Sequence, residues 1–356
     1  MNEKSGGRRH WDSYLDAPLF EDKLLQPGCN SAFDSQREHI DKLLRRFKPH
    51  RVACLGSGYL NDLPIELLFQ ISDETYFIDW LPNISVLGLG RRIIQHVEGV
   101  TRCIFCECTR PERFCRSFTG SMCESSSVCT AFSGLEDSKT RCVNYEPGDD
   151  PRFVRADVTS GRASRFAQRV FNAVQKSDTP KQAFNRAIRE CRRCSDVQDP
   201  IPIQSDSFNL VTSSLVASQF DAEPYDYFAR LVERKFGRDA VEAKERVLVP
   251  LMEELRAELF RVQIEGHCAE IFRLLNKEDG RAYLSVELFR SLPACDDFFL
   301  THESPRLLES LERHFFFDFV SIPAEKAVRG HAMGEGTSIV QSFVLRPKSD
   351  RYAPAA

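Results

Sequence analysis

The sequence lacks the long apolar stretches that mark membrane-spanning and exported proteins. None of its 356 residues lies in a run approaching the roughly 20 apolar residues of a transmembrane helix. The N-terminal stretch MNEKSGGRRHWDSYL contains no apolar segment of a secretory signal. Hydrophobic residues nevertheless make up 42% of the chain and charged residues 28%, a balance typical of a globular fold. We therefore expect a cytoplasmic protein that binds no membrane.

The sequence also lacks an excess of positive charge. Its 48 Lys and Arg side chains are outnumbered by 52 Asp and Glu, and the net charge is −4. This balance gives no general reason to expect nucleic acid as a partner. Residues 161–200 differ, because they hold nine Lys and Arg against four Asp and Glu. This basic segment could meet an acidic substrate or partner, or it could form a solvated helix face.

The stretch Arg51–Trp80 has the pattern strand, glycine turn, helix, strand and acid. Val52–Leu55 is apolar and uncharged, as a buried parallel strand requires. Gly56 and Gly58 follow at once, and without side chains they let backbone N–H groups approach a ligand closely. The second strand ends at Asp79, at about the 20-residue distance that separates the glycine turn from the ribose-binding acid in nucleotide-binding units.

Strands and helices alternate along the rest of the chain. The further strands that we expect are 152–157, 207–212, 281–289, 315–322 and 337–345. The expected helices are 36–47, 63–71, 83–96, two within 161–198 that are broken near 178–180, 222–276 with breaks near 237 and 250, and 305–313. Alternation predicts a doubly wound α/β fold with a mostly parallel sheet. The close succession of the last two strands predicts that they are adjacent and antiparallel.

These residues, in this order, resemble class I S-adenosylmethionine-dependent methyltransferases. The resemblance implies a seven-stranded sheet with a reversed last strand and S-adenosylmethionine as the cofactor. The glycine turn would pass under the amino-acid part of the cofactor, and Asp79 would bind the ribose hydroxyls. Asp157 would receive the adenine amino group, with Val158 against the ring, and Ser213 would line the floor near the sulfonium. The cofactor-binding residues that the resemblance implies are Gly56, Ser57, Gly58, Asp79, Trp80, Asp157, Val158 and Ser213.

The glycine turn departs from the family pattern in two places. Cys54 stands where an acid usually precedes the first glycine by two positions, and Asp62 is the candidate to replace it near the cofactor's ammonium group. Leu60 stands at the family's third glycine. One alternative is an NAD(P)-dependent oxidoreductase, but its G-x-G-x-x-G fingerprint would need glycine where Asn61 stands. Another is a cofactor- and zinc-binding Rossmann-like module without catalysis.

Methyl transfer needs in-line positioning and, for an oxygen or nitrogen acceptor, removal of a proton. The candidate bases after the fourth strand are Gln219, Asp221, Glu223 and Tyr225. Each could instead be a loop or capping residue, so the catalytic residue stays unknown. The tetrad of nucleic-acid amino-methyltransferases is absent where Ser213–Val216 stands, which argues against base methylation. We expect a small-molecule methyl acceptor first and a protein acceptor second.

Thirteen cysteines are many for a chain without an export signal, and a reducing compartment does not favour disulfides. A C-x-x-C step such as Cys103–Cys106 suits a tetrahedral zinc site, which would fold a segment poor in apolar residues. The expected metal ligands are Cys103, Cys106, Cys108, Cys115, Cys123, Cys129 and Cys142. The alternatives are an irregular loop and, with poorer spacing, an iron–sulfur cluster. Cys191 and Cys194 could join such a cluster or be ordinary helical cysteines.

The chain divides into an N-terminal part and a main domain. Residues 1–48 form the expected helical cap, and residues 49–350 form the methyltransferase-like Rossmann domain. Two insertions interrupt this domain, a cysteine-rich one at 100–150 and a basic helical one at 160–200. Trp11 in the cap could cover the cofactor or pack against the sheet edge.

Overall fold

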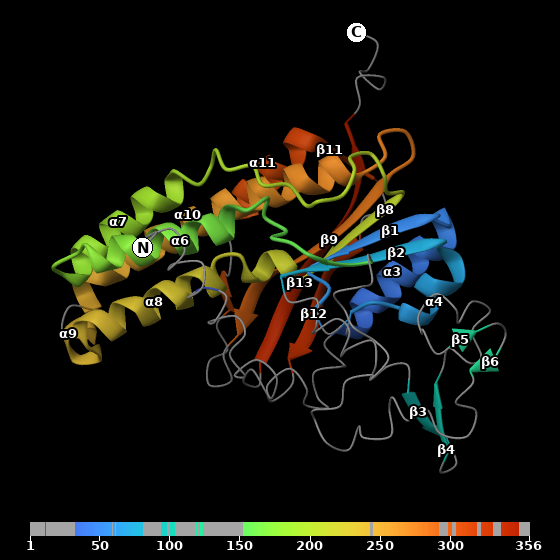
Figure 1. Cartoon of the computed structure of the whole chain (residues 1–356), viewed down its shortest axis with the longest axis horizontal. Coiled ribbons are helices and arrows are strands. Elements are labelled where there is room, and N and C mark those ends of the chain that lie inside the picture. Colours follow the sequence, from blue (N-terminus) through green and yellow to red (C-terminus); the bar gives the residue numbers. More distant parts are fainter. Residues whose placement is uncertain are drawn as a thin grey trace, which may run out of the picture.

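The computed structural model describes the chain outside its termini, several loops and most of the cysteine-rich segment. The described residues are 11, 33–58, 60, 62–80, 94–97, 100–103, 118–119, 122–123, 152–242, 245–291, 298–300, 304–318, 322–329 and 336–348. They form a mixed sheet with helices on both faces, and a group of helices extends from it to one side (Figure 1).

A single mixed sheet forms the centre of the protein. Its strands are β1 (Arg51–Leu55), β2 (Glu74–Asp79), β7 (Phe153–Arg155), β8 (Leu210–Ser214), β9 (Arg281–Ser291), β10 (Phe298–Leu300), β11 (Phe315–Phe317), β12 (Ile322–Arg329) and β13 (Gly336–Pro347). Seven of them lie in the order β11-β13-β9-β8-β1-β2-β7. In this order, the five neighbouring strands β9, β8, β1, β2 and β7 run parallel to one another. Strand β13 is antiparallel to both of its neighbours, β9 and β11. The predicted α/β fold with a reversed last strand is confirmed.

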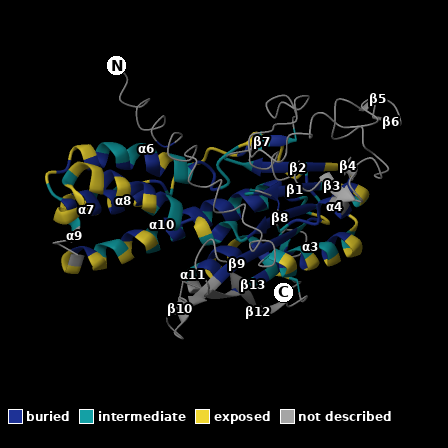
Figure 2. Cartoon of the chain, turned by 90° about the horizontal axis from the view of Figure 1, so that it is seen from below, coloured by how far each residue is buried: buried dark blue, intermediate teal, exposed yellow. Residues whose placement is uncertain are grey.

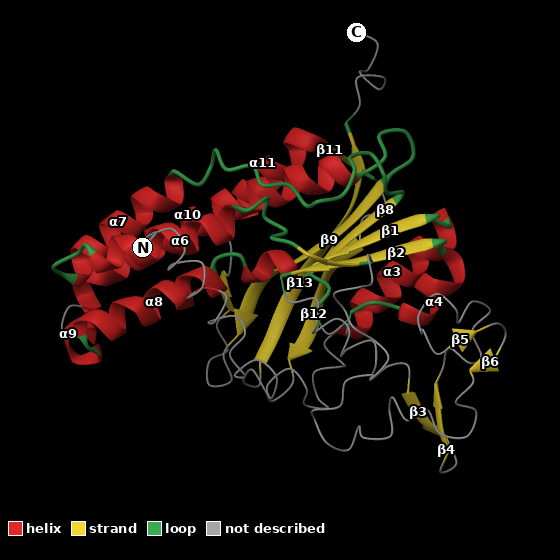
Figure 3. Ribbon diagram, viewed as in Figure 1, coloured by secondary structure: helices red, strands yellow, loops and turns green. Residues whose placement is uncertain are grey.

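Helices lie on both faces of the sheet and beside it (Figure 3). They are α3 (Asp34–Phe47), α4 (Ile65–Ile71), α6 (Arg162–Gln175), α7 (Pro180–Arg192), α8 (Ala222–Phe236), α9 (Arg238–Glu242), α10 (Glu245–Leu274), α11 (Ser304–His314) and the short 3₁₀ helix η7 (Val216–Gln219). Two small antiparallel pairs stand apart from the sheet. They are β3 (Ile94–Val97) with β4 (Val100–Cys103), and β5 (Phe118–Thr119) with β6 (Met122–Cys123).

The alternation of side chains along β1 separates two hydrophobic cores. Val52 and Cys54 pack with residues of α3 and α4 on one face. Ala53 and Leu55 pack on the other face with the C-terminal half of α10 and with α11. Figure 2 shows the buried strands between helices whose outer faces are exposed. Because each fully buried large apolar side chain contributes about 1.5–3 kcal/mol, these two cores position the strand ends firmly.

A third core holds together the helices beside the sheet, which we call the helical extension: α6, α7, α8, α9 and the N-terminal half of α10. Trp11 packs into it, with its ring 5.0 Å from that of Tyr227. The predicted break near 178–180 is the start of α7, where the Thr179 hydroxyl accepts a hydrogen bond from the Gln182 N–H and Pro180 opens the helix. Proline suits this position because its missing N–H would have no helical partner.

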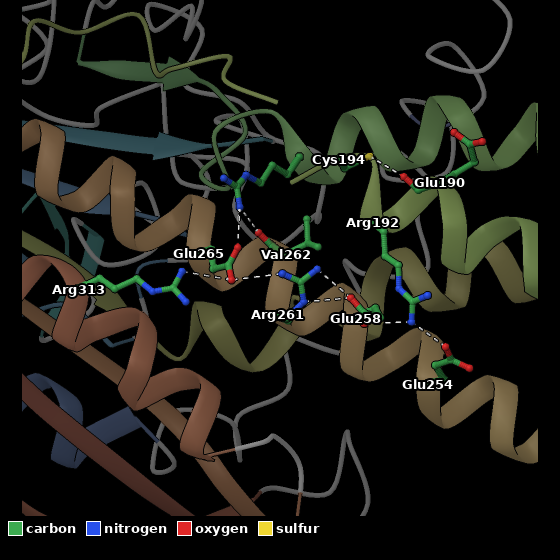
Figure 4. A network of polar contacts seen from close by, with 10 residues as sticks. Glu190, Arg192, Cys194, Glu254, Glu258, Arg261, Val262, Glu265 and Arg313 are labelled. Atoms are coloured by element: carbon green, nitrogen blue, oxygen red, sulfur yellow. Dashed lines mark hydrogen bonds and ion pairs between the residues drawn. The ribbon is translucent and has the colours of Figure 1, made fainter. Parts of the chain in front are cut away.

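One ion-pair network runs along the surface of α10 and joins it to α6, α7 and α11 (Figure 4). We call it the α10 network; its members are Arg162, Arg192, Glu254, Glu258, Arg261, Glu265 and Arg313. Arg192 contacts Glu254 at 2.8 Å, and Arg261 contacts Glu258 at 2.9 Å. Four cations therefore face three carboxylates, and the charges are nearly balanced.

Three local expectations from the sequence are wrong. The predicted break near Pro250 is absent, and α10 continues through this residue. Pro250 lies near the start of the helix, where it removes one backbone hydrogen bond, to the carbonyl of Arg246. The rest of the helix is held by its apolar packing. The end of the predicted helix 83–96 is strand β3, and the rest of that range lies outside the described residues. The segment between the expected strands 315–322 and 337–345 contains a further strand, β12, which pairs antiparallel with β13.

Candidate cofactor site at the carboxyl end of the sheet

The carboxyl ends of β1 and β2 are joined by hydrogen bonds at one edge of the sheet. The Gly56 N–H donates to the Ile78 carbonyl at 2.7 Å. The Gly58 N–H donates to Oδ2 of Asp79 at 3.0 Å. The glycine turn and the acid that the sequence analysis paired are therefore in direct contact. Ligands of open α/β sheets bind at this edge.

The two glycines of the turn have different surroundings. Both have a positive φ, +61° at Gly56 and +46° at Gly58. A Cβ at Gly56 would lie 2.3 Å from Cγ2 of Val216 in η7, so this glycine is needed for close packing of the protein itself. Among the described residues, a Cβ at Gly58 would have only the Gly56 carbonyl oxygen nearby, at 3.9 Å. Within the described part of the chain, Gly58 is thus the less crowded of the two glycines.

Leu60 follows the turn with an unusual backbone. Its φ is +61°, a left-handed conformation that non-glycine residues adopt at a cost of about 1–2 kcal/mol. Its side chain is fully buried against α3 and α4. Burial of the leucine compensates for the unfavourable backbone, and the loop keeps a shape that glycine usually provides.

Cys54 carries no charge at this edge. Burial raises the pKa of its thiol to about 12; a hydrogen bond with Thr212 opposes this shift, and the charge of nearby Asp62 adds to it. The thiol is therefore neutral and faces the core that contains α3 and α4. Asp62 is half-buried and close enough to affect the Cys54 pKa, which makes it the acid beside the end of β1.

Trp80 follows Asp79 and is half-buried against the helical extension. The Arg155 guanidinium lies 5.5 Å from the centre of its ring. The buried indole Nε1 has no hydrogen-bond acceptor among the described residues. Because a buried indole N–H usually finds an acceptor, Trp80, the residue after Asp79, holds a donor that the described residues leave unused.

Asp157 is engaged in the turn that starts α6. Oδ1 accepts hydrogen bonds from the N–H and hydroxyl of Thr159, and Oδ2 accepts hydrogen bonds from the N–H and hydroxyl of Ser164. Four donors match the roughly four acceptor positions of a carboxylate. An adenine amino group at this position would have to replace one of these internal donors.

Ser213 is buried and hydrogen-bonded to a histidine of the long helix α10. Its Oγ lies 2.7 Å from Nε2 of His267 in α10, and Nδ1 of the same ring lies 2.8 Å from the Val158 carbonyl oxygen. Because the carbonyl can only accept, Nδ1 carries the hydrogen, and Nε2 accepts the Ser213 hydroxyl. Burial lowers the pKa of His267 to about 4, so the ring is neutral at pH 7.

A serine hydroxyl that donates to a histidine is also the arrangement of an activated nucleophile. Both side chains are fully buried, so no substrate can reach them. The pair instead ties the end of β8 to α10 and to the residue after Asp157. One sequence feature could have indicated it: a histidine within the apolar positions of a long helix needs a buried partner.

The candidate bases after β8 lie at the start of α8. Asp221 is buried, and one of its oxygens accepts a hydrogen bond from Nε of Arg256 at 2.8 Å. Burial raises the pKa of Tyr225 to about 12, so its phenol stays protonated at neutral pH. Asp221 is held in an ion pair and Tyr225 is a weak base, and neither has the properties of a general base at pH 7. Gln219 ends η7, and Glu223 lies in the first turn of α8.

The side chains of the seven predicted metal ligands lie outside the described residues; only the backbone of Cys103 and Cys123 is placed, in β4 and β6. Cys191 and Cys194 are buried free thiols. Burial raises the pKa of Cys194 to about 11 and that of Cys191 well above its usual value. Metal binding requires thiolates. Among the described residues, no group of three or more His, Cys, Asp or Glu is placed to hold a metal ion.

The sequence matches no protein-family model and no curated protein. In the part of the chain that the structure describes, no helix combines the length and apolarity needed to cross a membrane.

Proposed function

We propose that the protein is an S-adenosylmethionine-dependent methyltransferase. The observation that carries this proposal is the hydrogen bond from Gly58 to Asp79, at the carboxyl edge of a mostly parallel sheet with a reversed last strand. The left-handed backbone of Leu60 adds support, because the resemblance requires glycine at that position.

The cofactor would supply an activated methyl group on a sulfonium, and the protein would bind and orient it. Asp79 would accept hydrogen bonds from the ribose hydroxyls while holding Gly58 in place. The Trp80 indole N–H would donate to the same ligand, since it has no acceptor among the described residues. Asp62 would contact the ammonium group in place of the neutral Cys54.

Val158 and Ser213 would make the remaining predicted contacts with the cofactor. Val158 is half-buried and packs with the core beneath the sheet edge, so its side chain would support the adenine ring. Ser213 would contribute to the floor through its position at the end of β8, because its hydroxyl is held by His267. We propose a small-molecule methyl acceptor before a protein acceptor, and zinc in the cysteine-rich segment.

Calorimetric titration with S-adenosylhomocysteine tests the proposal. We expect binding by the native protein and at least about tenfold weaker binding by Asp79→Ala, because each lost hydrogen bond to a charged group costs about 1.5–3 kcal/mol. The matched control is Asp73→Ala, directly before the start of the same strand, where the carboxylate contacts His50 at 2.9 Å. This control should bind normally.

Other outcomes separate the alternatives. No binding by the folded native protein would refute the methyltransferase proposal. Binding of NADH, lost in Asp79→Ala, would instead support an oxidoreductase. The observation that favours a non-catalytic module is the complete internal engagement of Asp157. Cofactor binding without transfer to any acceptor would support that module.

A further inference from the structure

A groove of about 450 Å³ lies between α6 and α7 in the helical extension. Its lining residues, which define what we call the basic groove, are Arg169, Asn172, Ala173, Lys176, Arg186, Arg189, Glu190 and Arg193. Five of these eight are cationic and one is anionic, which gives a net charge of +4 in a chain whose total is −4. The positive charge of the 161–200 segment is thus gathered on one surface.

The single carboxylate of the basic groove neutralises only part of this charge. Glu190 contacts Arg169 at 3.5 Å and Arg193 at 2.6 Å. Lys176 and Arg189 have no carboxylate contact among the described residues, and Arg186 donates to the backbone carbonyl of Lys176. At least three cations therefore lack a counter-charge within the described part of the protein.

Arg192, three residues after Arg189 on α7, has counter-charges within the protein. Arg192 contacts both Glu254 and Glu258 of the α10 network. Arg189, by contrast, contacts no carboxylate among the described residues, and Arg186, Arg192 and Arg193 stand three or four residues from it. Like charges at these spacings destabilise a helix by about 0.2–0.5 kcal/mol per pair. A ligand that removes this repulsion would be bound favourably.

We propose that the basic groove binds a small molecule that carries two or more phosphate groups. Two phosphate monoesters carry together about −3 to −4 charges at neutral pH, which matches the groove. Arginine guanidinium groups also fit phosphate oxygens in pairs of parallel hydrogen bonds. The volume lies within the roughly 300–1,000 Å³ of small-molecule sites, and a net charge of −4 gives no general reason to expect a nucleic acid.

The basic groove is separate from the candidate cofactor site. Ser164, which holds Asp157, lies on α6 five residues before Arg169 and twelve before Lys176, the residue that caps the end of this helix. At 1.5 Å per residue, the groove spans about 7–18 Å from that point along α6. Ligand binding in the groove therefore needs no contact with Asp79 or Gly58.

The test is calorimetric titration of the full chain with inorganic triphosphate, a sugar bisphosphate, ATP and a single-stranded oligonucleotide, at low salt. The decisive variant is Lys176→Gln with Arg189→Gln. Both side chains are exposed and have no ion pair among the described residues, so the fold should persist. We expect at least about tenfold weaker binding, because each lost charge-assisted contact contributes about 1.5–3 kcal/mol.

The matched control is Lys42→Gln with Arg46→Gln on α3, which removes the same charge from another exposed helix. It should bind phosphates as the native protein does. The proposal is overturned if no phosphate compound binds, if both double variants lose affinity equally, or if only the oligonucleotide binds. Stronger binding of ATP than of triphosphate would identify a nucleotide as the ligand. S-adenosylhomocysteine binding by the groove variant should be unchanged, so this test and that of the proposed function can fail separately.

Discussion

The α10 network and the basic groove use the same residue types on adjoining helices, yet their charges are arranged in opposite ways. In the network, Glu258 and Glu265 each contact two or more arginines, and their side chains are only 14% and 19% exposed. In the basic groove, one glutamate faces five cations. The difference indicates that the network stabilises the protein, whereas the groove is arranged for a ligand from outside.

The largest effect is expected at Arg162, the most buried cation of the α10 network. Its side chain is 11% exposed and donates to the Val262 carbonyl at 2.7 Å, besides facing Glu265 at 3.6 Å. Arg162→Met would remove this side-chain donor from the Val262 carbonyl and leave Glu265 with less compensation. We expect a loss of about 3 kcal/mol of unfolding free energy, measured by urea denaturation.

The control is Arg165→Met on the same helix, an exposed position at which the change should stay within about 0.5 kcal/mol. Equal losses in the two variants would show that the network contributes no special stability.

A second effect depends on pH and concerns His267, on the buried side of the same helix. Its pKa is lowered from 6.5 to about 4 in the folded state. The unfolded chain therefore binds a proton below pH 6.5 that the folded protein does not, and stability falls as the pH drops from about 6.5 to 4. A shift of this size corresponds to about 3 kcal/mol.

The variant His267→Asn isolates this contribution. Its amide can still donate to the Val158 carbonyl, but it does not titrate. Subtracting its stability profile from that of the native protein removes the titration of the acidic residues. The difference should be constant above pH 6.5 and should shrink toward pH 4. A difference that is independent of pH would contradict the buried, neutral histidine.

The sequence predicted the sheet better than it predicted these polar contacts. The uncharged apolar run Val52–Leu55 and the reversed last strand follow from patterns a few residues long, and both strands are confirmed. The continuity of α10 through Pro250 depends on tertiary packing, which a local proline rule does not include. His267 and Ser213 lie 54 residues apart, so no local pattern pairs them. Asp157 was noticed because it ends a strand, but its four internal donors come from a turn that the sequence alone did not reveal.

The smallest effect gives the sharpest contrast between the two regions. The change in unfolding free energy is expected to have one sign in the α10 network and the other sign in the basic groove. Arg189 and Arg192 lie three residues apart on α7, one in the basic groove and one in the α10 network. Arg192→Gln removes exposed ion pairs and should lower the unfolding free energy by at most about 1 kcal/mol. Arg189→Gln removes repulsion from Arg186 and Arg193 and should leave stability unchanged or raise it by about 0.2–0.5 kcal/mol.

Both differences should shrink as salt is raised from about 0.01 M to 1 M, since the screening length falls from about 30 Å to 3 Å. Urea denaturation of the two variants at both salt concentrations measures this. If Arg189→Gln destabilises the protein as much as Arg192→Gln, then Arg189 has a stabilising contact within the protein and the groove is not arranged for a ligand.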